Sequence, residues 1–104
     1  QEARDDLVVA SFECDSAIRP DQTTICSVPQ LAAMDIQMWT LFTVMSKLVR
    51  PDVLGAQQSA HQTFMNDRSA CGEDVACIGN LYVARIIEIG GIIDEIAARG
   101  PYGS

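Results

Sequence analysis

Length, composition and charge describe a small acidic globular domain. The chain has 104 residues, of which 48% are hydrophobic and 20% charged, and its formal net charge is −7. A chain of this length buries one modest core, and its composition is not that of a disordered protein. The negative charge argues against nucleic acid as a partner, because binding to phosphates requires clustered lysine and arginine. It is compatible with a basic protein partner, or simply with solubility.

We recognise no signal peptide in the sequence and expect no transmembrane segment. The longest nearly uncharged run, Ile36–Ser46, is shorter than the roughly 20 apolar residues that a spanning helix needs. The chain opens QEARDD, which is consistent with a mature start after signal cleavage. We expect one domain over residues 1–104, with a flexible arm at 1–10 and a tail at 100–104.

Four cysteines occur as two local pairs, Cys14 with Cys26 and Cys71 with Cys77. An even number in a short chain indicates disulfides, with three possible connectivities, of which we favour pairing within each local pair. Zinc sites usually have tighter cysteine spacing, and the chain has one histidine, so we expect no metal or other cofactor. Disulfides indicate an oxidising compartment, either the periplasm or the cell exterior.

The sequence predicts an all-α fold: a small disulfide-stapled bundle of one short and three longer helices behind an N-terminal arm. In the arm, the apolar stretch Leu7–Phe12 is either an extended strip or the first turns of a helix. A proline followed by an aspartate predicts the short helix over 21–27. The next helix begins at Ser27, as a cap, or at Pro29, in the first turn.

The central helix is predicted over residues 29–49, because its apolar residues recur at steps of three and four. Asp35 lies among these positions. We interpret the methionines and the phenylalanine as core residues rather than a binding groove. The apolar positions are Leu31, Met34, Met38, Leu41, Phe42, Met45, Leu48 and Val49.

A third helix is predicted over residues 52–71, with Asp52 as a cap, although Gly55 weakens its first turns and allows a later start. Its inner side is polar for a core face. His61, the one histidine, is interpreted as a hydrogen-bonded packing residue, with a pH-sensing role as the alternative. No nucleophile or acid stands at a telling spacing from it, so we do not expect an enzyme.

The last helix is predicted over residues 74–99 and has isoleucines at nearly heptad spacing. Gly72 fits the cap of the preceding helix, and the acidic pair Glu73 and Asp74 suits the positive end of the new helix dipole. Gly90-Gly91 marks a kink, a close helix contact or the end of the ordered helix. An alternative is that the isoleucines beyond the glycine pair pack on a second chain, which would make the protein a homodimer.

Charged or hydroxyl groups on three of the helices point to a shared interior. Asp35 is predicted to pair with Arg68, Arg85 or both, with Tyr82 nearby, because a lone buried charge is too costly. We interpret these residues as a structural polar network. A carboxylate held between arginines has a lowered pKa and is poorly suited to act as a general base.

Four segments together resemble the LprI-like lysozyme-inhibitor domain family, which consists of small secreted or lipid-anchored bacterial envelope proteins. They are SFEC (Ser11–Cys14), IC-x4-LA-x2-D-x2-M (Ile25–Met38), R-x2-C (Arg68–Cys71) and CI-x3-Y-x2-R-I (Cys77–Ile86). The resemblance covers about residues 11–89. It implies that the matched residues maintain the fold: Cys14, Cys26, Asp35, Arg68, Cys71, Cys77, Tyr82 and Arg85.

The chain also departs from the family pattern. The family usually has tryptophan at Phe64, glutamine at His61 and an acidic residue at Ser69 and Gln22, and tyrosine is common at Phe42. These positions lie on helices that we expect to pack, so the departures concern a binding surface more than the fold.

The resemblance implies a periplasmic or secreted protein that inhibits a lysozyme, and the acidic charge agrees with a basic lysozyme as partner. Glu73 and Asp74 are candidate contacts for basic residues at the rim of a cleft, unless they serve only the helix start. The alternative is a structural or chaperone-like envelope protein that binds partners through apolar helix surface.

Overall fold

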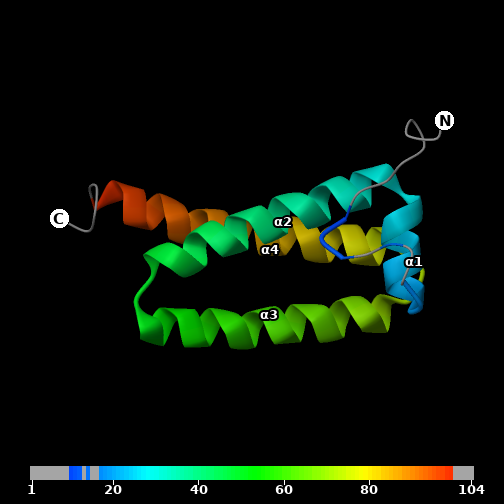
Figure 1. Ribbon diagram of the computed structural model, residues 1–104, viewed down its shortest axis with the longest axis horizontal. Helices are drawn as coiled ribbons and strands as arrows, with labels where there is room; N and C mark the ends of the chain where they lie inside the picture. The colour runs from blue at the N-terminus through cyan, green and yellow to red at the C-terminus, as the bar shows by residue number, and fades with distance from the viewer. Residues whose placement is uncertain (1–9, 13, 15–16, 100–104) are drawn as a thin grey trace.

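The computed structural model describes residues 10–12, 14 and 17–99, and it shows helices and no strand over these residues. The predicted all-α fold of one short and three longer helices is confirmed, and each predicted helix boundary lies within one residue of the observed one. The predicted arm up to residue 9 and the tail at 100–104 lie outside the described residues. The helices are α1 (Pro20–Ser27), α2 (Pro29–Leu48), α3 (Pro51–Cys71) and α4 (Val75–Ala98) (Figure 1).

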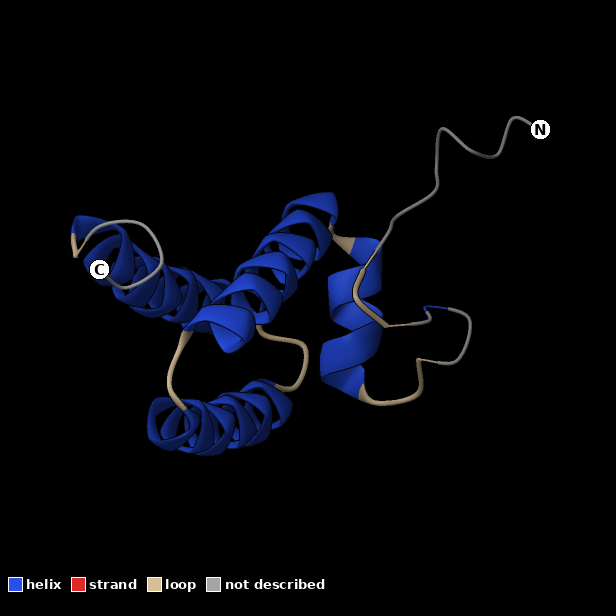
Figure 2. Ribbon diagram, turned by 60° about the vertical axis from the view of Figure 1, so that its left-hand side comes forward, coloured by secondary structure: helices blue, strands red, loops and turns tan. Residues whose placement is uncertain are grey.

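Three long helices run lengthwise and the short one closes one end. α2 and α4 lie side by side and run in the same direction, while α3 returns in the opposite direction (Figure 1). α1 stands across the end at which α2 and α4 begin (Figures 1 and 2). α2 packs most extensively on α4, and α3 packs on α4 and α1. Among the described residues, no helix covers the opposite end of the bundle, where α2 and α4 finish and α3 begins (Figure 1).

Prolines set the first turns of three helices. Pro20, Pro29 and Pro51 each occupy the first turn, where the missing N–H would have no partner and the fixed φ is already helical. The prediction that Asp52 caps α3 was wrong, because Arg50 is the cap residue and Asp52 lies inside the first turn. Gly55 does not delay the start of α3 either.

Ser27 does not cap α2, contrary to one of the two predicted starts. It is the last residue of α1, and its hydroxyl donates hydrogen bonds to the carbonyl oxygens of Thr23 and Thr24. Val28 is the cap residue of α2 and contributes no side-chain hydrogen bond. The start of α2 therefore depends on Pro29 in its first turn, which is the second of the two predicted starts.

The core follows the predicted faces. Met38 and Met45 have no exposed surface, so these methionines are core residues as predicted, whereas Leu48 at the end of the same helix is 53% exposed. All four helices contribute to this core. Its buried apolar residues are Ile25, Leu31, Ala32, Met38, Met45, Phe64, Ile78, Tyr82 and Ile89.

Both disulfides join the pairs that the sequence analysis favoured. Cys14 and Cys26, with Cα atoms 5.9 Å apart, attach the described part of the arm to α1. Cys71 and Cys77, with Cα atoms 5.7 Å apart, join the end of α3 to the start of α4. Gly72 makes the turn between them with φ +62°, a backbone conformation that residues other than glycine rarely adopt.

α4 continues without a break through Gly90 and Gly91. A Cβ atom placed on either glycine would meet no atom within 4 Å. The helix therefore does not end at this pair, and the pair does not serve a close helix contact, which excludes two of the three predicted roles.

α4 is also long and apolar enough to cross a membrane, judged by length and composition alone. This helix was not predicted as a membrane span, because Arg85 and Glu88 interrupt its uncharged run. A single such helix is weak evidence of a membrane location, since helices of soluble proteins pass the same test.

Candidate functional site

Four buried polar side chains, one from each helix, meet at the end of the bundle near α1. We call this group the polar network: Asp21 of α1, Asp35 of α2, Arg68 of α3 and Tyr82 of α4. None of them is more than 1% exposed. Polar groups at this depth are stable only when they bond to one another, so their geometry determines what the network can do.

Arg68 is the centre of the polar network. Its Nε donates a hydrogen bond of 2.7 Å to Asp21 Oδ2, and its Nη1 donates one of 2.9 Å to Tyr82 Oη. The Tyr82 hydroxyl in turn donates a 2.6 Å hydrogen bond to Asp35 Oδ1, which lies 3.8 Å from Arg68 Nη1. One guanidinium thus holds one carboxylate directly and a second one mainly through a phenol.

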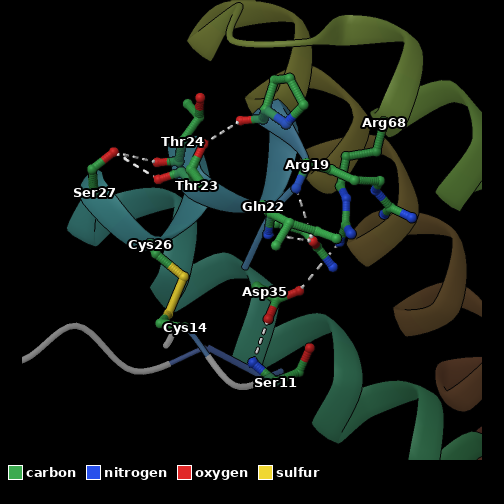
Figure 3. Close-up of a disulfide and its surroundings, with 12 residues drawn as sticks. Ser11, Cys14, Arg19, Gln22, Thr23, Thr24, Cys26, Ser27, Asp35 and Arg68 are labelled. Atoms are coloured by element: carbon green, nitrogen blue, oxygen red, sulfur yellow. Dashed lines mark hydrogen bonds and ion pairs between the residues drawn. A yellow bond between two sulfur atoms is a disulfide. The ribbon is translucent and has the colours of Figure 1, made fainter. Parts of the chain in front are cut away.

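Residues of the arm cover the polar network from outside. The backbone N–H of Ser11 donates to the second oxygen of Asp35 (Figure 3). The Phe12 ring lies over the Arg68 guanidinium, with its centroid 5.6 Å from Cζ. Because Cys14 is tied to Cys26, the disulfide keeps these arm residues against α1 and α2. The described end of the arm is therefore part of the site.

Three members of the polar network, Asp21, Arg68 and Tyr82, have pKa values shifted by their surroundings. Burial alone would raise the pKa of Asp21, but hydrogen bonds and charges from Arg68 and Arg19 outweigh it and lower that pKa. Burial opposes the charge on Arg68, yet Tyr82 and Asp21 raise its pKa overall. Burial and the neighbouring Asp35 raise the pKa of Tyr82, so the phenol remains a donor. Groups held this firmly suit a structural role better than proton transfer.

Two features differ from the predicted network. Arg85 is buried almost one turn beyond Tyr82 on α4, where its Nη1 donates to Gln57 Oε1 at 2.9 Å and to Glu88 Oε1 at 3.0 Å. It bonds to Gln57 of α3 and not to Asp35, because three residues carry it about 4.5 Å further along the helix axis. Asp21, the direct partner of Arg68, was interpreted only as a helix-start residue. No periodic pattern in so short a helix indicates that this carboxylate points inward.

His61 packs among aromatic rings instead of hydrogen bonding. Its ring centroid lies 4.7 Å from those of Trp39 and Phe42 and 5.8 Å from that of Phe64. Both ring nitrogens are buried and have no hydrogen-bond partner in the described part of the chain. Burial, followed by the positive charges of Arg85 and Arg68, lowers its pKa. The predicted packing role is observed without the predicted hydrogen bond, and the pH-sensing role stays a prediction.

The predicted acidic pair lies on the disulfide-closed turn between α3 and α4. We call residues 71–77 the acidic turn. Asp74 is exposed but caps α4, because its Oδ1 accepts a 3.1 Å hydrogen bond from the Cys77 backbone N–H. Glu73 is exposed and has no hydrogen bond or ion pair within the described residues. Of the pair, Asp74 thus has the structural role, and the carboxylate of Glu73 is available to a partner.

Over residues 10–12, 14 and 17–99, no three His, Cys, Asp or Glu side chains are grouped to hold a metal ion. In comparisons with known proteins, no family model, curated protein or solved structure matches the chain.

Proposed function

We propose that this protein is a binding protein of the periplasm or the cell exterior that inhibits a basic lysozyme-type peptidoglycan hydrolase. The observation that carries the proposal is the acidic turn, a rigid, exposed and negatively charged feature on an acidic protein. The resemblance of the sequence to the lysozyme-inhibitor family supports it. The two disulfides are compatible with an oxidising compartment.

Three of the residues that carry the family resemblance are too deeply buried to contact a partner. Asp35, Arg68 and Tyr82 have no exposed surface, so they build the scaffold. Any partner must bind exposed residues, which the shared pattern does not specify. These buried residues stabilise the fold through the polar network. The residues that contact a partner must therefore be sought on the surface.

The acidic turn has the properties of such a contact. The disulfide between Cys71 and Cys77 and the capping bond of Asp74 hold its backbone before a partner arrives, which lowers the entropic cost of binding. Glu73 presents an unpaired carboxylate there. With a net charge of −7 behind it, this surface attracts a basic protein at low ionic strength.

The direct test is lysozyme-catalysed lysis of bacterial cell walls, titrated with this protein at low and moderate salt. We expect stoichiometric inhibition that weakens as salt screens the charges. Glu73→Lys should weaken inhibition by roughly 5-fold or more, corresponding to about 1 kcal/mol for a surface charge. Asp52→Lys is the matched control, because it makes the same charge change at an exposed position at the far end of α3.

Two results would overturn this proposal. One is the absence of inhibition for every lysozyme class tested. The other is an equal effect of both lysine variants, which would mean that net charge alone, and not the acidic turn, determines the binding.

A second candidate function is a structural or chaperone-like role through apolar helix surface, including self-association. The observation in its favour is that Val44 of α2 and Val83 and Ile87 of α4 are 42%, 48% and 69% exposed. Sedimentation velocity tests it: a dimer that becomes monomeric in Val83→Ser/Ile87→Ser supports this function. A native monomer that also fails to suppress aggregation of a client protein contradicts it.

A further inference from the structure

A pocket of about 750 Å³ opens at the end of the bundle opposite α1. The end of α2, the start of α3 and the end of α4 form its walls, and these segments gather at the same end of the bundle in Figure 1. Its size falls within the range of about 300–1,000 Å³ that is usual for small-molecule sites. Its walls are mainly apolar and include Leu48, Val49, Val53, Ile92 and Ile96.

Three basic residues and the acidic Glu95 line this mainly apolar pocket, although the protein as a whole is acidic. The chain has only seven lysine and arginine residues, and three of them, Lys47, Arg50 and Arg99, line the pocket. Arg68 and Arg85 are buried elsewhere. Of the four exposed basic residues in the described chain, three thus lie at the end where apolar walls are open to solvent, and the fourth, Arg19, pairs with Asp21 at the start of α1.

Neighbouring acids neutralise two of the three pocket cations. Arg50 pairs with Asp52 at 3.3 Å, and Arg99 pairs with Glu95 at 3.7 Å. Lys47 is exposed and has no ion pair within the described residues. One positive charge therefore remains unbalanced next to an apolar surface, with the paired Arg50 guanidinium close to it in the sequence.

We propose that this pocket binds a single-chain amphiphile with an anionic head, of the long-chain fatty acid class. The alkyl chain lies along Leu48, Val53 and Ile92, where its burial removes apolar surface from water. The carboxylate lies at the rim, where it pairs with Lys47. A nucleotide would find too few polar partners among these walls, and a cationic amphiphile would meet repulsion at the rim.

This inference does not rest on the proposed inhibition of lysozyme. The pocket and the acidic turn lie at opposite ends of α3, so variants at one site leave the other unchanged. Loss of fatty acid binding and loss of inhibition are therefore separate results.

Isothermal titration calorimetry of the full chain tests the proposal, with sodium dodecanoate below its micelle concentration as the probe. We expect saturable 1:1 binding that weakens with salt, and no comparable binding of dodecyltrimethylammonium, which has the same tail and the opposite charge. Lys47→Gln should weaken dodecanoate binding several-fold, and Lys47→Arg should retain most of it, because the charge is kept.

A pocket-filling pair of variants tests the location. Val53→Trp places an indole in the pocket and should abolish dodecanoate binding. Thr63→Trp is the control: it places an indole in a smaller cavity of about 390 Å³ between α3 and α4 and should leave dodecanoate binding unchanged. Circular dichroism confirms that each variant is folded, and Ile96→Phe provides a milder filling change if Val53→Trp does not fold.

The proposal is overturned by the absence of saturable 1:1 binding of dodecanoate, by equal binding of the cationic amphiphile, or by equal loss in the two tryptophan variants. Association with phosphatidylglycerol vesicles in the absence of 1:1 dodecanoate binding also overturns it, because it indicates a membrane surface and not a pocket.

Discussion

The two ends of the bundle are built by different means. At the closed end, α1, both disulfides and the polar network hold four helices together through directed bonds. At the open end, where Lys47 and Ile96 line the pocket, helices are joined by one short connection and a cavity lies between them. Because the disulfides and the polar network stabilise the fold at the closed end, the helices at the open end do not need to pack tightly and can leave a cavity between them.

The largest effect is expected from breaking the closed end at Arg68. Arg68→Ala leaves Asp21 buried without its main partner and removes the donor to Tyr82, so we expect a loss of about 3–5 kcal/mol in the free energy of unfolding. Urea unfolding followed by circular dichroism measures it. Arg99→Ala at the open end is the control and should cost no more than about 0.5 kcal/mol. Similar losses in both variants would contradict the comparison.

A smaller effect is expected from the link between Arg68 and Asp35. Tyr82→Phe keeps the packed ring but removes the hydroxyl that donates to Asp35 and accepts from Arg68. We expect a loss of about 1–3 kcal/mol, because two buried polar groups lose a partner. The same urea experiment measures it. An unchanged midpoint would show that Arg68 reaches Asp35 without the phenol.

Between the two ends, His61 should make stability depend on pH. Its pKa is lowered in the folded protein, so the unfolded chain takes up a proton as pH falls through about 6.5 and the folded protein does so only at a lower pH. Stability should therefore fall from pH 7 to pH 5. Asp21 does not contribute in this window, because its pKa is lowered from 3.8 and its effect is lost only at more acidic pH.

His61→Phe is the variant that isolates this effect, since a neutral ring stays among Trp39, Phe42 and Phe64. Thermal unfolding between pH 5 and pH 7 should show a flatter pH dependence for the variant than for the native protein. Parallel curves for the two proteins would mean that His61 titrates alike in the folded and unfolded chains.

The smallest effect is a gain at the open half of α4. Gly90→Ala and Gly91→Ala should each stabilise the protein by up to about 1 kcal/mol, because the added methyl meets no atom and alanine favours the helix. Gly72→Ala is the contrasting control and should destabilise, because φ is +62° there. Thermal unfolding distinguishes the signs. Destabilisation by Gly90→Ala would indicate a partner or a bend that needs the glycine.

Local features of the sequence predicted most of the helical architecture. Pro29 and Pro51 mark helix starts through their own backbone geometry, and the spacing of Met38 and Met45 reflects one helical face. Each cysteine pair is close in sequence, so short loops made those connections the favourable ones. None of these inferences required knowledge of how the helices pack.

The polar network was predicted only in part, because its members lie far apart in sequence. Tyr82 and Asp35 are 47 positions apart, as are Arg68 and Asp21. A helical pattern shows which face a residue occupies but not which neighbour that face meets. The prediction therefore left Arg68 and Arg85 as alternative partners of Asp35, of which only Arg68 lies beside it, and Asp21 was not recognised.

Four features could be predicted without the fold, because each follows from a residue and its near neighbours: the helices, the two disulfide pairs, the acidic charge and the burial of Asp35. The tertiary structure alone decided that Asp21 is the partner of Arg68, that His61 packs without a hydrogen bond, and that a pocket opens at the far end. The physical reason is that these three features arise where separate helices meet, and the angle and spacing between packed helices depend on the whole core at once.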